Sequence, residues 1–324
     1  MRILITGGSG FIGSHLVEHF HSSTDVIVLD NLRSGHRHNL NGLTHTFIQA
    51  SVTDRTAVDQ AMVGIDVVFH LAAMISVPES MAAPRECAEI NVLGLLNVLE
   101  SATAAGVRKV ILASSAAIYG DNPTVPKIEP MLPEPMSPYA ITKLDGEYYL
   151  ELFRRQGKLD TASLRFFNVF GPRQDPKSAY AAAVPIFIQQ ALTGTDLTIF
   201  GDGQQTRDFV HVTDIVAALA HVASRPDLHG TYNVGYGHSM TVNDLATQII
   251  QLSGSSSKIT HLPERPGDVK HSRASIDKLL ATGFRHQSSL QQGLTKTLAH
   301  RAKEDRRSGI VDQGSETQVA SVTP

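Results

Sequence analysis

The first half of the chain alternates between short apolar runs and longer stretches whose apolar residues recur every three to four positions. The runs are rich in β-branched residues, and continuous ones such as 67–69 and 110–112 are typical of strands buried on both faces. Strands are therefore expected at 2–6, 25–30, 44–50, 66–72, 109–115 and 161–169, with helices between most of them at 12–21, 54–62, 88–105 and 140–155.

This alternation predicts an α/β fold, in which a doubly wound parallel sheet is covered by helices on both faces. The carboxyl ends of parallel strands share one edge of the sheet, and ligands bind there in such folds. The residues at these strand ends are expected around one crevice: Gly7, Asp30, Leu71, Ser115 and Asn168.

The second half is less regular and is interrupted by prolines, which indicates a smaller substrate-binding domain. We expect the larger domain at 1–167, to which the chain returns at about 208–236. The smaller domain then takes about 168–207 and 237–300. From residue 301 charged and small residues dominate, so 301–324 are predicted to be a disordered tail.

Composition narrows the class of protein. The 324 residues are 42% hydrophobic and 18% charged, as in ordinary soluble globular proteins. A formal net charge of -3 gives no electrostatic reason to expect nucleic acid or an anionic membrane as partner. No apolar run approaches the roughly 18 residues of a membrane span, and the start does not resemble a signal peptide. We expect a cytoplasmic protein.

The metal-binding residue types give no recognisable site. The single cysteine, Cys87, excludes an internal disulfide and a cysteine-based zinc site, and it is expected to be a small buried hydrophobe. His15 and His19 have a spacing that can chelate a metal, but no carboxylate or cysteine partner is recognisable. His70 ends a buried strand and is expected to be a core histidine. No metal site is predicted.

The segment from Thr6 to Gly13 reads TGGSGFIG directly after the first predicted strand. Gly7 permits a tight turn, Gly10 lets the backbone approach phosphates, and Gly13 lets the helix pack closely on the strand. The helix N-terminus offers free N–H groups and a positive dipole end to an anion. The segment predicts a Rossmann-type dinucleotide site.

Asp30 ends the second predicted strand, seventeen residues after Gly13. This is close to the spacing at which an acid binds the adenosine ribose hydroxyls. A carboxylate there repels a 2′-phosphate, which favours NAD over NADP, although the nearby Arg33 weakens that preference.

Tyr139 and Lys143 stand at positions i and i+4. A helix that begins at Pro138 would place both side chains on one face. An ammonium group beside a phenol lowers the phenol pKa from its usual value of about 10, which suits a general base for an alcohol proton. Ser115 ends a strand 24 residues earlier, where its hydroxyl can bridge a substrate hydroxyl and the tyrosine.

With Asn91, these features make the chain resemble the extended short-chain dehydrogenase/reductase superfamily, and within it the UDP-glucose 4-epimerases. The segments 174–176 and 179–181 resemble the branch that accepts UDP-N-acetylglucosamine. The resemblance covers about residues 1–300, and its landmarks keep their order: DNLRSG at 30–35, FHLAA at 69–73, SSAAIYG at 114–120, RFFNVFGPRQDP at 165–176, IFGDGQQTRDFVHV at 199–212 and RPGD at 265–268.

The resemblance implies a role for each residue. Tyr139 would be the base, Lys143 would lower its pKa and hold the nicotinamide ribose, and Ser115 would orient the sugar 4-hydroxyl. Hydride would pass from C4 to a bound NAD, the 4-keto sugar would turn its other face, and the hydride would return with inversion. The implied NAD contacts are Gly7, Gly10, Phe11, Ile12, Gly13, Asp30, Asn31, Ser51, Val52, Leu71, Ala72, Ala73, Asn91, Ser114, Tyr139, Lys143 and Phe166.

The resemblance also implies a UDP-sugar site in which arginines hold the diphosphate in a bidentate way. Its residues would be Ser76, Ser115, Tyr139, Asn168, Val184, Thr198, Phe200, Arg207, Arg265, Asp268 and Ser272. Two positions depart from the family pattern. Ser51 stands where an aspartate usually meets adenine, which predicts weaker NAD binding, and Phe166 replaces a tyrosine.

The dehydratases of this superfamily carry an Asp-Glu pair after the strand-end hydroxyl, whereas this chain has Ala116 and Ala117. Methyl groups cannot move protons, which argues against dehydration and decarboxylation. Ser272 stands at the position that gates the sugar 2-substituent, and a serine leaves room for an acetamido group. We therefore expect a 4-epimerase of UDP-GlcNAc/UDP-GalNAc, of UDP-Glc/UDP-Gal, or of both.

Two alternatives are a UDP-glucuronate 4-epimerase and a non-catalytic NAD-binding scaffold protein. The resemblance further implies a homodimer through a four-helix bundle, formed by the helices near 88–105 and 140–155.

Overall fold

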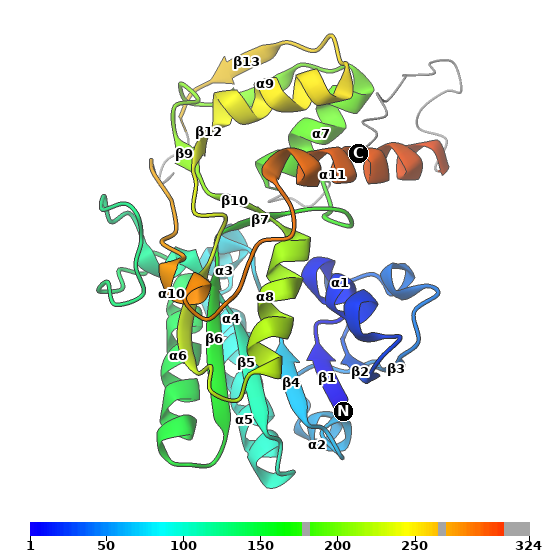
Figure 1. Ribbon diagram of the computed structural model, residues 1–324, viewed down its shortest axis with the longest axis vertical. Helices are drawn as coiled ribbons and strands as arrows, with labels where there is room; N and C mark the ends of the chain where they lie inside the picture. The colour runs from blue at the N-terminus through cyan, green and yellow to red at the C-terminus, as the bar shows by residue number, and fades with distance from the viewer. Residues whose placement is uncertain (177–181, 265–269, 308–324) are drawn as a thin grey trace.

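The structure is a computed structural model that describes residues 1–176, 182–264 and 270–307. Within these residues, seven parallel strands form a central sheet (Figure 1). From one edge to the other, the strands are β11 (Gly230–Val234), β6 (Asp160–Phe166), β5 (Lys109–Ser115), β4 (Val67–His70), β1 (Arg2–Thr6), β2 (Asp25–Leu29) and β3 (Thr46–Ile48).

Helices cover both faces of this sheet, which confirms the predicted doubly wound α/β fold. Successive side chains of β1 point to opposite faces, so that Ile3 and Ile5 enter one core and Leu4 enters the other. The first core is closed by α1 (Phe11–Phe20) and α8 (Val212–Ser224), and the second by α2 (Arg55–Ala61), α5 (Gly94–Ala104) and α6 (Pro138–Arg155).

A smaller domain lies over the carboxyl ends of the strands, at the top of Figure 1. Its helices are α7 (Ala183–Thr193), α9 (Val242–Ser253) and α11 (Leu290–Arg307). Among the described residues it has three two-stranded ribbons, which pair β10 (Phe209–His211) with β7 (Asn168–Phe170), β12 (Met240–Thr241) with β9 (Thr206–Arg207), and β13 (Ile259–Leu262) with β8 (Leu197–Phe200).

Over the described ranges, six short helical elements lie in the connections between these strands and helices. They are η1 (Arg37–Leu40), α3 (Val77–Ala82), α4 (Pro84–Ala88), the π-helical turn η2 (Glu89–Leu93), η3 (Ala116–Tyr119) and α10 (Asp277–Leu280). None of the helices in the described residues has the length and apolar character needed to cross a bilayer.

Two predicted elements are divided in the structure. The strand expected at 161–169 ends at Phe166, because the chain leaves the sheet at Phe167 and continues as β7 beside β10. The N–H of Phe167 donates to the carbonyl of Val234 at 3.0 Å, which fixes this exit. The helix expected at 88–105 is interrupted by η2, which carries Asn91.

The predicted disordered tail begins too early, because α11 continues to Arg307. Arg301 ties the helix to α7, since its guanidinium donates to Gln189 Oε1 at 2.6 Å, and it also pairs with Asp305 of its own helix at 3.0 Å. Asp305 is buried, so this turn packs against the protein. Residues 308–324 lie outside the described residues.

The end of α8 is held by a buried lysine from the sheet. Lys109, at the start of β5, is 2% exposed. Its Nζ donates to the carbonyls of Val222, Arg225 and Leu228 at 3.2, 2.7 and 2.8 Å. It also pairs with Asp160 at 3.0 Å. A cation here satisfies the carbonyl groups that a helix leaves free at its C-terminus.

Candidate active site

The glycine turn after β1 has the shape of a phosphate cradle. Gly7 has φ +71°, and a Cβ atom placed on it would lie 2.8 Å from the N of Ala72. A Cβ on Gly13 would lie 2.2 Å from the carbonyl oxygen of Gly7. A Cβ on Gly10 would meet only that same oxygen, at 3.3 Å, among the described residues. Gly7 and Gly13 are thus packed tightly against the protein, whereas Gly10 has open space beside it. This arrangement fits the pyrophosphate of a dinucleotide.

Donors and an acceptor border this cradle. Residues 11–13 open α1, and the first N–H groups of a helix have no partner within the helix, so they are available to an anion. Asp30 is 6% exposed, and its carboxylate accepts from the N–H groups of Ser9 at 2.9 Å and Leu32 at 2.7 Å. The loop after β2, which includes the exposed Asn31, is therefore fixed to the glycine turn.

The predicted adenine-side residues lie at the neighbouring strand ends. Ser51 Oγ accepts from the N–H of Thr53 at 3.2 Å and from its hydroxyl at 2.8 Å. Val52 is buried, and its side chain lies where a Cβ on Gly94 would collide at 2.6 Å. Residues 71–73 follow β4 and pass directly beside the glycine turn.

The three predicted catalytic residues come together at the carboxyl end of β5. Pro138 begins α6, as expected, and Ser137 caps it by accepting from the N–H of Ala140 at 3.2 Å. Tyr139 therefore sits in the first turn, where its phenol is hydrogen-bonded to Ser115. One turn later, Lys143 Nζ lies 5.8 Å from the centre of the Tyr139 ring.

The electrostatics differ from the expectation for this pair. Burial raises the pKa of Tyr139, and the hydrogen bond with Ser115 only partly offsets it. Lys143 is 5% exposed, donates to the carbonyl of Ala113 at 2.8 Å, and has its pKa lowered to about 8 by burial. The predicted lowering of the tyrosine pKa is therefore not seen in the chain alone, because desolvation outweighs the interaction with Ser115.

His70 and Cys87 are buried as expected. His70 is 1% exposed, its Nδ1 lies 2.9 Å from Thr6 Oγ1, and burial lowers its pKa to about 3, so the ring is neutral at pH 7. Cys87 is fully buried. In the described ranges no three His, Cys, Asp or Glu side chains gather into a metal site.

Asn91 was predicted to contact the cofactor, but its side chain is engaged within the protein. Its Oδ1 accepts from the N–H of Met74 at 2.7 Å, and its Nδ2 donates to the Met74 carbonyl and to Thr142 Oγ1, both at 3.0 Å. The amide thus joins the loop after β4 to the catalytic helix. In this structure Asn91 holds the walls of the site in place.

Sequence reasoning missed a buried network beneath the catalytic residues. Ser114, which is predicted to touch the cofactor, donates its hydroxyl to Glu147 Oε1 at 2.5 Å. Glu147 pairs with Arg165 at 2.7 Å, and Arg165 donates to the hydroxyl of Tyr119 at 2.8 Å. Glu147 follows Lys143 by four residues, so its helical spacing was the signal that could have revealed it.

Three predicted site residues, one for the cofactor (Phe166) and two for the substrate (Asn168 and Ser76), lie where the chain enters or borders the upper domain. Phe166 ends β6 with 8% exposure, and the exposed Asn168 begins β7. Ser76 caps α3 by accepting from the N–H of Glu79 at 3.1 Å. All three lie at or beyond the carboxyl ends of sheet strands, where ligand-binding positions are expected.

The other predicted substrate residues belong to the small domain. Thr198 and Phe200 occupy the half-buried face of β8, while Val184 is 1% exposed within the domain core, so its side chain is unavailable to a ligand. Arg207 and Ser272 are neighbours, since the carbonyl of Thr206 accepts from the N–H of Ser272 at 3.1 Å. Arg265, Asp268 and 179–181 lie outside the described residues.

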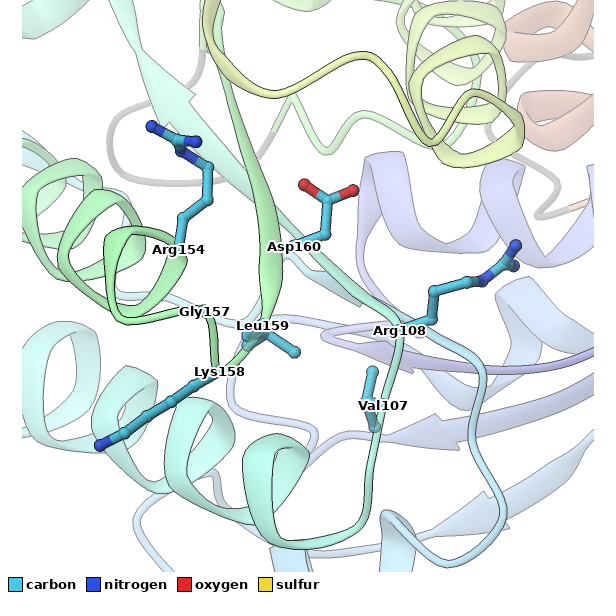
Figure 2. A pocket seen from close by; sticks show the side chains of 7 residues that line it. All are labelled: Val107, Arg108, Arg154, Gly157, Lys158, Leu159 and Asp160. Atoms are coloured by element: carbon cyan, nitrogen blue, oxygen red, sulfur yellow. The ribbon is translucent and has the colours of Figure 1, made fainter.

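A hollow of about 400 Å³ lies at the amino ends of β5 and β6, opposite to the carboxyl ends where the candidate site lies (Figure 2). Its lining comes from the amino end of β6 and the segments before β5 and β6, and it includes Arg108 and Asp160. It contains none of the predicted site residues, so it is separate from the crevice at the carboxyl ends.

Comparison with known proteins identifies this arrangement. The model of the NAD dependent epimerase/dehydratase family matches residues 3–235. A UDP-glucose 4-epimerase of Mycolicibacterium smegmatis is 38% identical over 313 residues, which cover 92% of this chain and 97% of that protein. The chain belongs to the NAD-dependent epimerase/dehydratase family.

Two solved structures agree with this assignment. A UDP-N-acetylglucosamine 4-epimerase from Methanobrevibacter ruminantium, in complex with UDP-N-acetylmuramic acid, has a TM-score of 0.91 and 39% identity, covering 94% of this chain and 98% of its own. A UDP-glucose 4-epimerase of Thermus thermophilus in complex with NAD has a TM-score of 0.85 and 38% identity, covering 93% and 98%. The protein is an enzyme of the 4-epimerase branch, as the sequence predicted, and its cofactor is NAD.

Proposed function

We propose that this epimerase interconverts the C4 epimers of UDP-hexoses, accepting UDP-GlcNAc/UDP-GalNAc as well as UDP-Glc/UDP-Gal. The observation that carries this proposal is the meeting of Ser115, Tyr139 and Lys143 at the carboxyl end of β5, two strands away from the glycine turn that follows β1. A hydroxyl, a phenol and an ammonium at one end of a dinucleotide crevice suit oxidation and reduction of a secondary alcohol.

Each of the three residues has a distinct task. NAD, when bound, supplies the hydride acceptor and donor at C4 of the sugar. Tyr139 removes the proton of the 4-hydroxyl and returns it, while Ser115 holds that hydroxyl in line with the phenol. The burial that raises the Tyr139 pKa must be overcome in the working complex, and the Lys143 ammonium contributes to this.

The residues after β5 favour epimerisation over elimination. Ala116 and Ala117 follow Ser115 directly in η3, where an acid would be needed to move protons at C5 and C6. Alanine offers no such group. The 4-keto sugar therefore undergoes no elimination. It turns its other face to the cofactor and is then reduced.

The nucleotide end of the substrate is assigned to the small domain. Arg207 is the described arginine that we assign to the diphosphate, with Asn168 below it and Phe200 beside the uracil. Ser272 lies next to Arg207 and is only partly exposed, so a small side chain borders the sugar end. This favours room for an acetamido group, and the similarity to a UDP-N-acetylglucosamine 4-epimerase supports the same breadth.

We also propose a homodimer through helices η2, α5 and α6. Exposed apolar side chains follow one stripe of α6, at Ile141, Tyr148 and Leu152, and Leu93 of η2 is 56% exposed. Positions i, i+7 and i+11 lie on one helix face, which suits a helix–helix interface. Sedimentation of Tyr148→Glu as a monomer, against a dimeric wild type, is the expected result. We also propose, as a separate point, that the protein is located in the cytoplasm.

The test of substrate is direct. The purified protein is incubated without added NAD with UDP-Glc, UDP-GlcNAc and UDP-GlcA separately, and C4 epimers are resolved by NMR. Equilibration of both UDP-Glc and UDP-GlcNAc is expected. Turnover of UDP-Glc alone would contradict the open pocket at Ser272. Turnover of UDP-GlcA alone would identify a glucuronate epimerase, and no turnover with NAD bound would indicate a scaffold protein.

A further inference from the structure

Arg33, in the loop after β2, is bound by two carboxylates from another part of the chain. Its Nη2 pairs with Glu79 of α3 at 2.9 Å, and its Nη1 forms a short contact with Glu86 of α4. The bonds to Glu86 and Glu79 raise the pKa of the arginine further above its usual range. Because both ends of the guanidinium are engaged, Arg33 is not free to receive the 2′-phosphate of NADP.

These ion pairs cross the cofactor crevice. The order of strands places β1 between β2 and β4. Arg33 follows β2, whereas Glu79 and Glu86 follow β4, so a bond between them spans the carboxyl end of β1. The glycine turn that receives the pyrophosphate lies at that end.

The loop that carries Arg33 rests directly on the glycine turn. A Cβ atom on Gly35 would lie 2.8 Å from the carbonyl carbon of Ser9, and the N–H of His36 donates to the Ser9 carbonyl at 3.0 Å. The loop therefore stands against the cradle, and the arginine extends from it toward α3 and α4.

The segment that carries Glu79 and Glu86 also contacts the catalytic helix α6. Ser80 follows Glu79 in α3, and its hydroxyl accepts from the backbone N–H of Tyr139 at 3.2 Å. Asn91 fixes the loop that leads into α3, through Met74. The paired carboxylates thus stand on a segment attached to the start of α6, and Arg33 links this segment to the adenosine side of the crevice.

We propose that Arg33, Glu79 and Glu86 form an ionic strap across the dinucleotide crevice that slows the release of NAD. The strap offsets the loss of the adenine-side aspartate that is replaced by Ser51. It rests on NAD as the cofactor and not on which sugar is the substrate. Its failure is therefore distinguishable from a wrong choice of UDP-sugar.

The test measures how fast the holoenzyme exchanges its NAD. Protein loaded with NAD is diluted into excess isotope-labelled NAD, and the bound cofactor is weighed by mass spectrometry over time. Arg33→Met and the double variant Glu79→Gln/Glu86→Gln are both expected to release NAD about 3–10-fold faster, the size expected from losing two partly exposed ion pairs. Raising the salt concentration should accelerate release from wild type more than from either variant.

A matched arginine provides the control. Arg55 is also bound by two carboxylates of similar exposure, Asp59 and Glu100, but these stand on α2 and α5, which cover the same face of the sheet. Arg55→Met should exchange NAD at the wild-type rate. A release rate of Arg33→Met within two-fold of wild type, with an unchanged unfolding temperature, overturns the strap. Equal acceleration in Arg55→Met overturns it as well.

Discussion

The two halves of the candidate site are built differently. On the cofactor side, Asp30, Asn91 and Lys143 are at most 6% exposed and hydrogen-bonded to fixed backbone groups at the edge of a seven-stranded sheet. On the substrate side, Thr198 and Ser272 are half-buried beside ribbons of two to four residues. The cofactor side is thus held by a rigid layer, whereas under the proposed function the sugar would be selected by short elements that change with few substitutions.

The largest effect is expected from removing the base on the rigid side. Tyr139→Phe deletes the hydroxyl that exchanges the 4-hydroxyl proton and keeps the ring, so kcat should fall by about 10³-fold or more. Conversion of UDP-Glc, followed by NMR, measures this. Tyr149→Phe, on the same helix, should keep wild-type activity. A loss in Tyr139→Phe smaller than ten-fold would show that another group moves the proton.

Stability should depend on the buried pair beneath the site. Arg165→Met leaves the Glu147 carboxylate without its cation, in side chains that are 6% and 5% exposed, and should lower the free energy of unfolding by about 3–5 kcal/mol. Arg154→Met removes a partly exposed pair with Glu151, within α6, and should change the free energy of unfolding by less than about 1 kcal/mol. Urea unfolding compares the two. Equal losses would mean that the rigid layer does not depend on this network.

The charge of Lys143 should appear in the pH dependence of stability. Its pKa is about 8 when folded and 10.5 when unfolded. Between these values the unfolded chain binds the proton and the native protein does not, so the free energy of unfolding should rise with pH. Relative to Lys143→Met, wild type should gain about 2–3 kcal/mol from pH 7.5 to 10.5. A flat difference between the two unfolding series would show that the ammonium is not desolvated.

The smallest effect is expected on the substrate side. Ser272→Tyr should lower kcat/KM for UDP-GlcNAc by about 10–100-fold, because a ring would occupy the space left for the acetamido group. The value for UDP-Glc should change by less than about three-fold, which makes it the internal control. Parallel losses on both sugars would mean that Ser272 supports the fold of this region and does not select the substrate.

The sequence predicted the large domain well because its signals are local. Continuous apolar runs rich in β-branched residues are typical of strands buried on both faces, and the bounds of β1 and β5 match the prediction. The glycine turn and the Tyr139–Lys143 spacing are also local, and both occur where they were expected. These features depend on steric fit and helix period, which neighbouring residues decide.

The parts that were missed depend on contacts between distant segments. Arg165 and Glu147 are joined only because β6 lies beside β5 and α6 covers both. The raised pKa of Tyr139 follows from burial, which no spacing reveals. The continuation of α11 to Arg307 depends on Gln189 of another helix. A pattern of charged residues alone had favoured a disordered tail.

The bond between Lys109 and the end of α8 has a consequence for how the chain is made. Strands β5 and β6 are synthesised long before α8 and β11. Until both are made, the outer edge of β6 is unpaired, and α1 alone covers its part of the face that α1 and α8 close together. The crossing segments of the small domain must therefore be synthesised before the large domain can close. During that interval the Lys109 ammonium lacks the three carbonyl groups, at the end of α8 and in the turn after it, that accept its hydrogen bonds in the folded protein.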